Sequence, residues 1–250
     1  MVVRIRELAD AAAIHDAAAL FDRIWGIGRN DRSLDPSMFR ALAHTGNYVA
    51  GVYDGSTLVG ASAGFFAEDG HLHSHITGIA PEYQGRGIGR MLKQHQRDWV
   101  LARGRTAISW TFDPLIARNA YFNLHSLGAT VVDYLPDFYG AMDDGVNAGD
   151  ATDRLYVVWA LGTPAPRAPA AADVPALVAR DGDQPVTRTV RGARLAVATP
   201  ADIEKLRAHD RDLAVRWRTA VREAMVGALA DGYRITGITR DGHYLLEVNP

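Results

Sequence analysis

The segment from His71 to Arg90, HLHSHITGIAPEYQGRGIGR, constrains the fold of this 250-residue chain more than any other stretch. Leu72 to Ile79 predict a β-strand, because side chains alternate around a β-branched centre. Pro81 cannot donate a hydrogen bond to a sheet ladder, so the strand is expected to end just before it. Apolar residues at helical spacing then predict a helix that runs through Val100. The chain therefore passes from a strand into a helix across a glycine-rich loop.

The loop itself, Gln84 to Gly89, predicts an anion-binding site. Glycines let the backbone turn tightly and bring several N–H groups close to an anion, and the helix N-terminus adds its positive dipole end. Arg86 and Arg90 add full positive charges. The spacing fits neither the Walker loop nor the dinucleotide-binding G-x-G-x-x-G fingerprint. We interpret the loop as a pyrophosphate cradle, with an ordinary turn before a helix as the alternative.

The same loop resembles the Q/R-x-x-G-x-G/A loop of the GNAT acyl-CoA N-acyltransferases, with Gln84, Gly87 and Gly89 in the three fixed places. The resemblance implies the α/β (α+β) GNAT fold, a mixed and mostly antiparallel sheet flanked by helices. It also implies acetyl-CoA or another acyl-CoA as cofactor. The residues expected to bind this cofactor are Thr77, Gly78, Ile79, Gln84, Gly85, Arg86, Gly87, Ile88, Gly89, Arg90, Asn119 and Asn123.

The domain organisation follows from the order of the predicted elements. Residues 1–162 predict β-α-α-β-β-β-α-β-α-β-β, the order of the GNAT fold, with Asp10 and Asp35 capping the first two helices. Residues 163–185 are rich in Pro and Ala and predict a linker. Residues 186–250 predict a small α+β extension of two helices and three strands. Because so short a segment builds a thin core, we expect it to pack on the acyltransferase domain or against a second subunit of a homodimer.

Composition excludes several classes of protein. The chain has no cysteine, which rules out disulfides, thiolate metal sites and a cysteine nucleophile. A net charge of −2 disfavours nucleic acid as a partner. We expect no membrane association, because no apolar run is long enough to span a bilayer, and a cytoplasmic location, because Glu7 and Asp10 do not fit a secretory signal.

Three alternating histidines on the central strand are the candidate bases. His71, His73 and His75 should point to one face of that strand. The resemblance places His73 where several GNAT enzymes carry a glutamate base, so we predict His73 as the catalytic base and His75 as the next candidate. An imidazole titrates near neutrality and can take a proton from an ammonium directly or through water. The alternatives are a zinc site, for which no further ligand is apparent, and histidines that only line the sheet.

The proton donor is where the sequence departs from the family. Many GNAT enzymes carry a tyrosine four residues before the glycine that ends their last helix, and here that position is Leu124. Tyr121, one turn earlier on roughly the same face, is the predicted substitute, and Tyr139 is the other candidate. A thiol is a good enough leaving group that the reaction need not use an acid at all.

The acceptor is expected to be a small molecule that carries an amine. Arg154 is predicted to clamp a carboxylate, of an amino-acid acceptor or of a dicarboxyl-CoA such as succinyl-CoA, with an Asp153–Arg154 pair at a strand start as the alternative. The resemblance implies that the region between the first two helices borders the acceptor pocket, so Arg29 and Arg32 are further candidates, with a solvated loop that carries one packed tryptophan as the alternative. The residues expected to bind substrate are Trp25, Trp110, Asp113, Tyr139 and Arg154.

The predicted function is transfer of an acetyl or succinyl group from acyl-CoA to the amine of a metabolite such as an amino acid, without a metal. Two other hypotheses stay open at this point. One is a CoA-binding regulatory module without turnover. The other is a protein N-terminal or lysine acetyltransferase.

Overall fold

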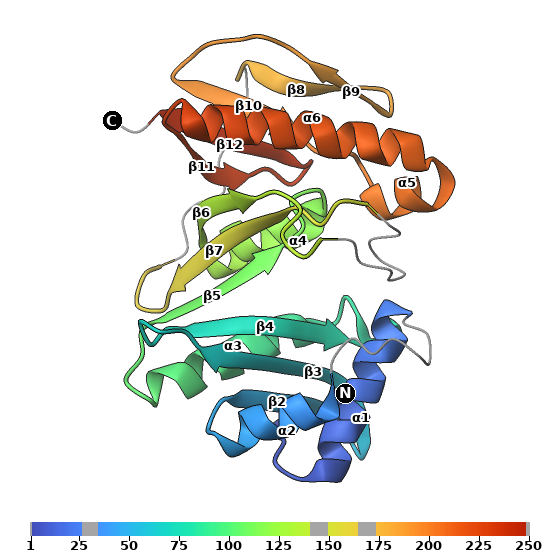
Figure 1. Ribbon diagram of the computed structural model, residues 1–250, viewed down its shortest axis with the longest axis vertical. Helices are drawn as coiled ribbons and strands as arrows, with labels where there is room; N and C mark the ends of the chain where they lie inside the picture. Colours follow the sequence, from blue (N-terminus) through green and yellow to red (C-terminus); the bar gives the residue numbers. More distant parts are fainter. Residues whose placement is uncertain (1, 27–34, 141–149, 165–173, 249–250) are drawn as a thin grey trace. The chain divides into compact units, whose positions relative to one another are not determined.

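The computed structural model describes residues 2–26, 35–140, 150–164 and 174–248 (Figure 1). These residues form two compact units, the first ending at Trp110 and the second beginning at Thr111. Arg29 and Arg32, two of the expected acceptor residues, lie outside the described residues. Within the described ranges, no helix has the length and apolarity needed to cross a membrane.

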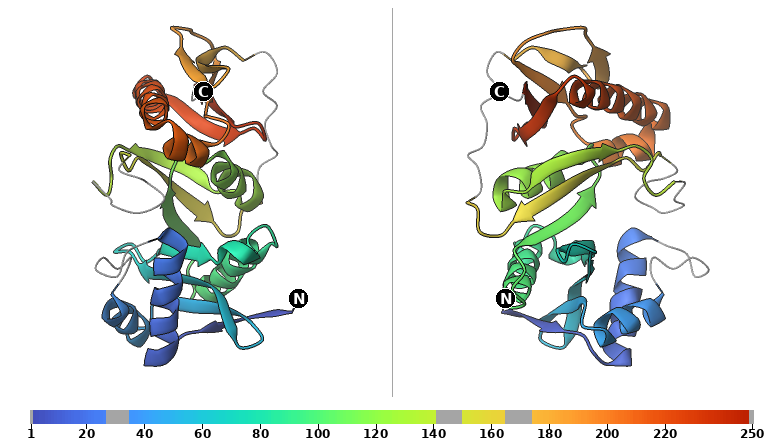
Figure 2. Two further views of the ribbon diagram at one scale, coloured as in Figure 1. Left: turned by 90° about the vertical axis from the view of Figure 1, so that its right-hand side faces the viewer. Right: turned by 60° about the vertical axis from the view of Figure 1, so that its left-hand side comes forward.

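Unit 1 is a sheet with helices on both faces. Its strands follow the order β1-β2-β3-β4-β5, antiparallel from β1 to β4 and parallel between β4 and β5. Helices α1 and α2 cover one face and α3 the other (Figure 2). The elements are β1 (Val3–Glu7), α1 (Ala11–Trp25), α2 (Pro36–His44), β2 (Tyr48–Asp54), β3 (Thr57–Phe66), β4 (Leu72–Ile79), the 3₁₀ turn η1 (Pro81–Tyr83), α3 (Ile88–Leu101) and residues 107–110 of β5 (Ala107–Phe112).

The two expected helix starts are confirmed. The Asp10 carboxylate accepts a hydrogen bond from Ala13 N at 2.8 Å, and the Asp35 carboxylate accepts one from Ser37 N at 2.8 Å. Each satisfies a backbone donor that the first turn of a helix cannot satisfy itself. Helix α1 ends at Gly26, whose φ of 63° suits a glycine.

Unit 2 contains a strand pair and a five-stranded sheet. Strands β6 and β7 are antiparallel. The five-stranded sheet has the order β11-β12-β10-β8-β9, and the long helix α6 packs across it (Figure 1). The elements are α4 (Ala117–Tyr121), the π-helical turn η2 (Phe122–Leu127), β6 (Thr130–Leu135), β7 (Arg154–Ala160), β8 (Ala176–Asp181), β9 (Gln184–Thr187), β10 (Arg194–Ala198), α5 (Ile203–His209), α6 (Arg211–Ala230), β11 (Tyr233–Ile238) and β12 (His243–Val248).

Two expectations about the second half of the chain are wrong. The predicted linker contains β8 and the first residues of β9, so the C-terminal sheet has five strands and not three. Val178 is fully buried in β8, which shows that a short strand can pack although Pro and Ala surround it. The sequence from Leu115 to Leu127, before Gly128, predicts a single helix, but the structure has a short α-helix followed by a π-helical turn. The expected domain boundary near residue 162 stays a prediction.

Candidate active site

The central strand β4 carries a one-residue bulge beside its histidines. The pairs Ala63↔Ile76 and Phe65↔His73 are two residues apart on β3 and three residues apart on β4. Gly64 lies opposite the bulge, and a Cβ on it would lie 2.6 Å from the carbonyl oxygen of His73. Only a glycine fits such an approach of two backbones. The bulge therefore fixes how the following side chains project.

Both expected bases pack against the same aromatic side chain at this bulge. The rings of His73 and His75 pack against Phe65, with centroids 5.2 Å and 5.9 Å from its ring. The pKa of His73 is lowered to about 4 by burial and by the nearby charges of His75, His71 and Lys93. Burial also lowers the pKa of His75. Both rings are therefore neutral near pH 7, the form in which an imidazole can accept a proton.

Strands β4 and β5 are joined over only a short length. Their registered pairs are Leu72↔Ile108 and His73↔Ser109. Beyond His73, no residue of β4 has a β5 partner in the part of the chain that the structure describes. The side of Thr77 to Ile79 that faces away from β3 is therefore open to a ligand's hydrogen bonds. The pairing of β4 with β5 therefore ends at His73, the residue predicted to be the catalytic base.

The glycine loop after β4 has the geometry of an anion cradle. Gly85 and Gly87 have φ values of 73° and 78°, and Gly87 caps α3 without a side-chain hydrogen bond to the first turn. Within the described residues, nothing lies within 4 Å of a Cβ added to either glycine or to Gly89. The Gln84 side chain donates to the carbonyl of Ile79 at 3.3 Å, which ties the loop to the end of β4. The open N-terminus of α3 fits a pyrophosphate.

A chain of hydrogen bonds connects His73 to the surface. Ser109 Oγ, fully buried on β5, lies 3.0 Å from His73 Nδ1 and 2.8 Å from His71 Nε2. His71 Nδ1 in turn binds the carboxylate of Asp69, which is exposed. The sequence predicts the histidines, but it gives no signal that Ser109 joins two of them.

A buried lysine, Lys93, is the other residue that sequence reasoning missed. From α3 its Nζ donates to Ser74 Oγ at 2.9 Å and to Gln96 Oε1 at 3.3 Å, and it lies 3.9 Å from the centroid of the Trp110 ring. Burial lowers the pKa of Lys93 to about 7. No carboxylate forms an ion pair with it among the described residues. Trp110, expected to bind substrate, is buried against this amine and belongs to the core.

Trp25 lies against the central strand, as a residue near the acceptor should. A Cβ added to Gly78 would lie 3.0 Å from Trp25 Cη2 and 2.8 Å from Ile24 Cδ1. Helix α1 therefore approaches β4 closely at one of the residues expected to contact the cofactor.

In unit 2, Asp113 belongs to a buried ion cluster. Its carboxylate accepts from Arg218 at 2.8 and 2.9 Å and from Arg207 at 2.6 Å, and both arginines also bind Asp150. No side chain of the four is more than 5% exposed. Burial alone would raise the pKa of Asp113, but the two guanidiniums outweigh it and hold that pKa well below its ordinary value. Asp113 therefore belongs to this cluster, and its expected role in substrate binding stays a prediction.

Arg154 and Tyr139 lie together in the same unit. Arg154 Cζ is 5.2 Å from the centroid of the Tyr139 ring, and the Tyr139 hydroxyl is 3.1 Å from Thr111 Oγ1. The alternative Asp153–Arg154 ion pair is not formed, because the Asp153 carboxylate binds Arg222 at 2.5 and 2.9 Å. Arg154 has no carboxylate partner among the described residues, and burial lowers its pKa. It remains the candidate carboxylate clamp.

The remaining candidates lie on α4 and η2. The Tyr121 hydroxyl accepts a hydrogen bond from Arg240 Nε at 3.2 Å, so it faces the turn between β11 and β12. Asn123 is buried, and its carbonyl accepts from Ala129 N at 3.0 Å. Asn119 is exposed. The cofactor and acid roles of these residues stay predictions.

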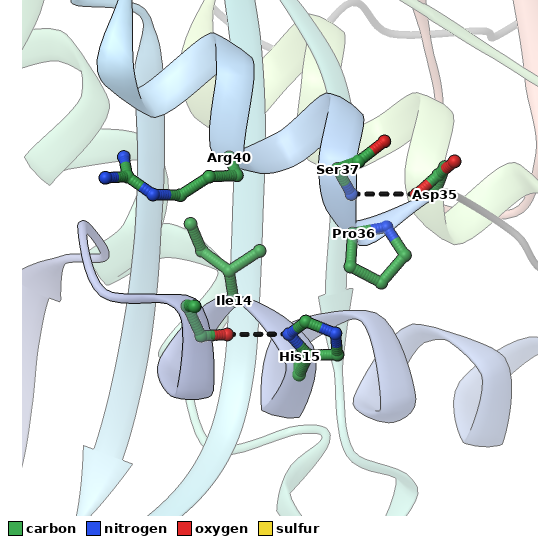
Figure 3. Close-up of a pocket in the computed structure, with 7 residues that line it drawn as sticks. Ile14, His15, Asp35, Pro36, Ser37 and Arg40 are labelled. Carbon is green, nitrogen blue, oxygen red and sulfur yellow. Dashed lines mark hydrogen bonds between the residues drawn. The ribbon is translucent and has the colours of Figure 1, made fainter.

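A surface pocket of about 290 Å³ lies apart from all these residues, between α1 and α2 (Figure 3). His15 Nδ1 contacts the carbonyl of Ala11 at 2.8 Å, and Asp35 caps α2, so these polar groups already have structural partners. The lining residues are Ala11, Ile14, His15, Asp35, Pro36, Ser37 and Arg40. None of the predicted site residues is among them.

Comparison with known proteins gives a consistent picture. No curated protein sequence matches this chain. Residues 14–125 match the sequence model of the Acetyltransferase (GNAT) family.

Three solved structures share the fold. YncA from Salmonella typhimurium, solved with its cofactor acetyl-CoA, is 21% identical over 69% of this chain and 100% of its own, with a TM-score of 0.53. An N-acetyltransferase from Staphylococcus aureus Mu50 is 11% identical over 64% and 99%, with a TM-score of 0.53. The aminoglycoside 6'-acetyltransferase type Ii is 18% identical over 66% and 100%, with a TM-score of 0.51. The expected fold class is confirmed.

Proposed function

We propose, from the match of residues 14–125 to the Acetyltransferase (GNAT) family model and from the geometry of the site, that the chain is an acyl-CoA-dependent acetyltransferase, and we propose its acceptor and its catalytic residues. The proposed reaction is transfer of an acetyl or succinyl group to the amine of a small metabolite, an amino acid or a related amine, by direct attack on the thioester. The observation that carries this proposal is the place of His73, where the pairing of β4 and β5 ends, on the strand that leads into the glycine loop.

Acyl-CoA supplies an activated thioester, and the residues of unit 1 fit its binding. The loop from Gln84 to Gly89 would hold the pyrophosphate on the open N-terminus of α3, with positive charge from Arg86 and Arg90. The unpaired side of Thr77 to Ile79 would hydrogen-bond the amides of the pantetheine arm. Backbone N–H groups on the same edge are suited to an oxyanion, because they are fixed in direction before the reaction begins.

His73 acts as the general base in this proposal. Its low pKa keeps the ring neutral, so the lone pair needed to take a proton from the acceptor's ammonium is present across the neutral range. His75, on the same side of β4 and 6.3 Å from His73 between ring centroids, is the second candidate. Trp25 provides an apolar wall beside Gly78.

Arg154 is proposed to bind a carboxylate of the acceptor or of the acyl group. A guanidinium held beside the Tyr139 ring, without a carboxylate partner among the described residues, suits two parallel hydrogen bonds to such a group.

The test is thiol release from acetyl-CoA and succinyl-CoA with a panel of amino acids, polyamines and peptides. The absence of cysteine means that the protein adds no thiol background. We expect turnover with acceptors of one small-amine class, a fall of about 100-fold or more in kcat for His73→Ala, and no change for His15→Ala on the outer face of α1.

Turnover confined to peptides would replace the metabolite by a protein acceptor. Binding of CoA without turnover on any acceptor would leave a regulatory module. Full activity of His73→Ala would move the role of base to another residue, with His75 tested next.

A further inference from the structure

We propose that Ser109, His71 and Asp69 form a proton relay that carries the acceptor's proton from His73 to the protein surface. The inference rests on the proposed role of His73 as base, and it adds three positioning residues that act through it. All four side chains belong to unit 1, and every link between them is a direct contact.

The direction of the hydrogen bonds follows from proton counting. A serine hydroxyl has one proton, so Ser109 can donate to only one of the two imidazole nitrogens that it contacts and must accept from the other. The Asp69 carboxylate can only accept, so His71 Nδ1 carries a proton. While His71 is neutral, its Nε2 is therefore an acceptor and receives the Ser109 proton. His73 must then donate from Nδ1, which leaves its Nε2 unprotonated and able to act as base.

Each proton transfer in the relay balances. His73 Nε2 takes a proton from the acceptor's ammonium, which becomes a neutral amine. The Nδ1 proton of His73 then passes to Ser109 Oγ while the hydroxyl proton of Ser109 passes to His71 Nε2. His73 is again neutral, Ser109 is again a hydroxyl, and the positive charge lies on His71 beside Asp69. Loss of the Nδ1 proton of His71 to water leaves both rings neutral with their proton on Nε2, and exchange of these ring protons with water after product release restores the starting tautomers.

The relay addresses a weakness of His73 as a base. With a pKa of about 4, His73 holds a proton poorly, because it is buried and faces His75, His71 and the amine of Lys93. From β3 and β5 it meets Phe65 and Ser109, which carry no charge. The cation that the relay forms on His71 lies directly against the Asp69 carboxylate, which has the opposite charge.

The solvent exposure of the side chains increases along the relay from Ser109 to Asp69. Ser109 is 0% exposed, the His71 side chain is 18% exposed and the Asp69 side chain is 70% exposed. The path therefore leads from a dry strand interior to water in three steps.

The first test reads the tautomer of His73 by long-range ¹H–¹⁵N NMR near pH 7, with His73→Ala used to assign the signal. We expect the proton on Nδ1 in the wild type and a loss of this preference in Ser109→Ala. The relay is overturned if wild-type His73 carries its proton on Nε2, or if Ser109→Ala leaves the tautomer of His73 unchanged.

The second test is kinetic and uses a matched pair of exposed carboxylates. Asp69→Asn keeps a hydrogen-bond acceptor for His71 but removes the charge. Glu68→Gln is the control, because it removes a neighbouring exposed charge that takes no part in the hydrogen-bond chain. We expect kcat to fall about tenfold or more in Asp69→Asn and Ser109→Ala, with KM for acyl-CoA unchanged, and no effect of Glu68→Gln. Ser109→Cys, which keeps a transferable proton, should recover part of the loss in an assay that follows thioester absorbance.

A solvent-isotope series distinguishes proton transfer along the hydrogen-bond chain from a purely structural role of Ser109. Two or more protons in flight give a curved dependence of kcat on the D₂O fraction in the wild type, and a linear dependence is expected in Ser109→Ala. Equal curvature in both overturns the relay. If the tautomer behaves as expected while His73→Ala retains full activity, the proposed base fails although the hydrogen-bond chain is real.

Discussion

Replacing Lys93 by Met should stabilise the protein, and the gain should shrink as the pH rises. Lys93 is buried on α3 with neutral partners, and its pKa of about 7 lies far below the 10.5 of an exposed lysine. The unfolded chain therefore binds a proton more tightly than the folded chain between these two values, and wild-type stability must rise with pH across that range. Methionine has a similar length, carries no charge and packs well against Trp110.

The size of the effect follows from the two pKa values. A difference of this size destabilises the folded state by about 4 kcal/mol at pH 7 and by about 2 kcal/mol at pH 9. Met also removes the hydrogen bonds to Ser74 and Gln96, which offsets roughly 2 kcal/mol at either pH. The variant should thus be more stable by about 2 kcal/mol at pH 7 and nearly equal to the wild type at pH 9.

Urea unfolding of wild type and variant at both pH values measures this difference, because the other titrating groups cancel between the two proteins. Lys205→Met is the control, since Lys205 is the only other lysine and its side chain is 80% exposed. A free-energy difference between Lys93→Met and wild type that is the same at pH 7 and pH 9 refutes the reasoning, because it would mean that the buried amine does not titrate in this range.

Three further predictions concern the bulge, the ion cluster and the carboxylate clamp. Gly64→Ala should lower the free energy of unfolding by about 2 kcal/mol and reduce kcat, because its Cβ would meet the His73 carbonyl; unchanged kcat would contradict the role given to the bulge. Asp113→Asn should destabilise by about 3 kcal/mol or more in thermal unfolding, and because the pKa of Asp113 is lowered, wild-type stability from this group is present above the ordinary aspartate pKa and is lost as the pH falls below it. Arg154→Lys should raise KM about tenfold for the substrate that carries the carboxylate; an equal rise for substrates without one would remove the clamp.

Local patterns in the sequence predict most of the elements correctly. The bounds of β4 agree with those expected, because its side chains alternate around a β-branched centre and Pro81 follows closely after its end. The caps at Asp10 and Asp35 act through bonds to residues two or three positions away, which sequence reasoning can see.

Features that depend on distant residues could not be predicted in this way. Asp113 meets Arg218 across 105 positions, and nothing in either neighbourhood indicates the pairing. Ser109 joins His71 and His73 only because β5 lies parallel to β4 at that register. The bulge had one available signal, a glycine inside a strand at Gly64, which is often a mark of close backbone approach.

The π-helical turn affects the comparison with the family's tyrosine, whose position is placed at Leu124 by counting four residues back from Gly128. The Gly128 N–H bonds to the carbonyl of Asn123, five residues earlier, where an α-helix would use the fourth. Positions counted in α-helical steps therefore shift by one residue along this turn. Leu124 is buried, and Asn123 beside it is buried as well.

The ion cluster limits how this protein can be divided into fragments. Asp113 lies within the stretch that matches the family, but both of its arginine partners come from α5 and α6, near the end of the chain. A fragment that stops before these helices would lose both arginines that bind the Asp113 carboxylate, so the stretch that matches the family depends on side chains from outside it.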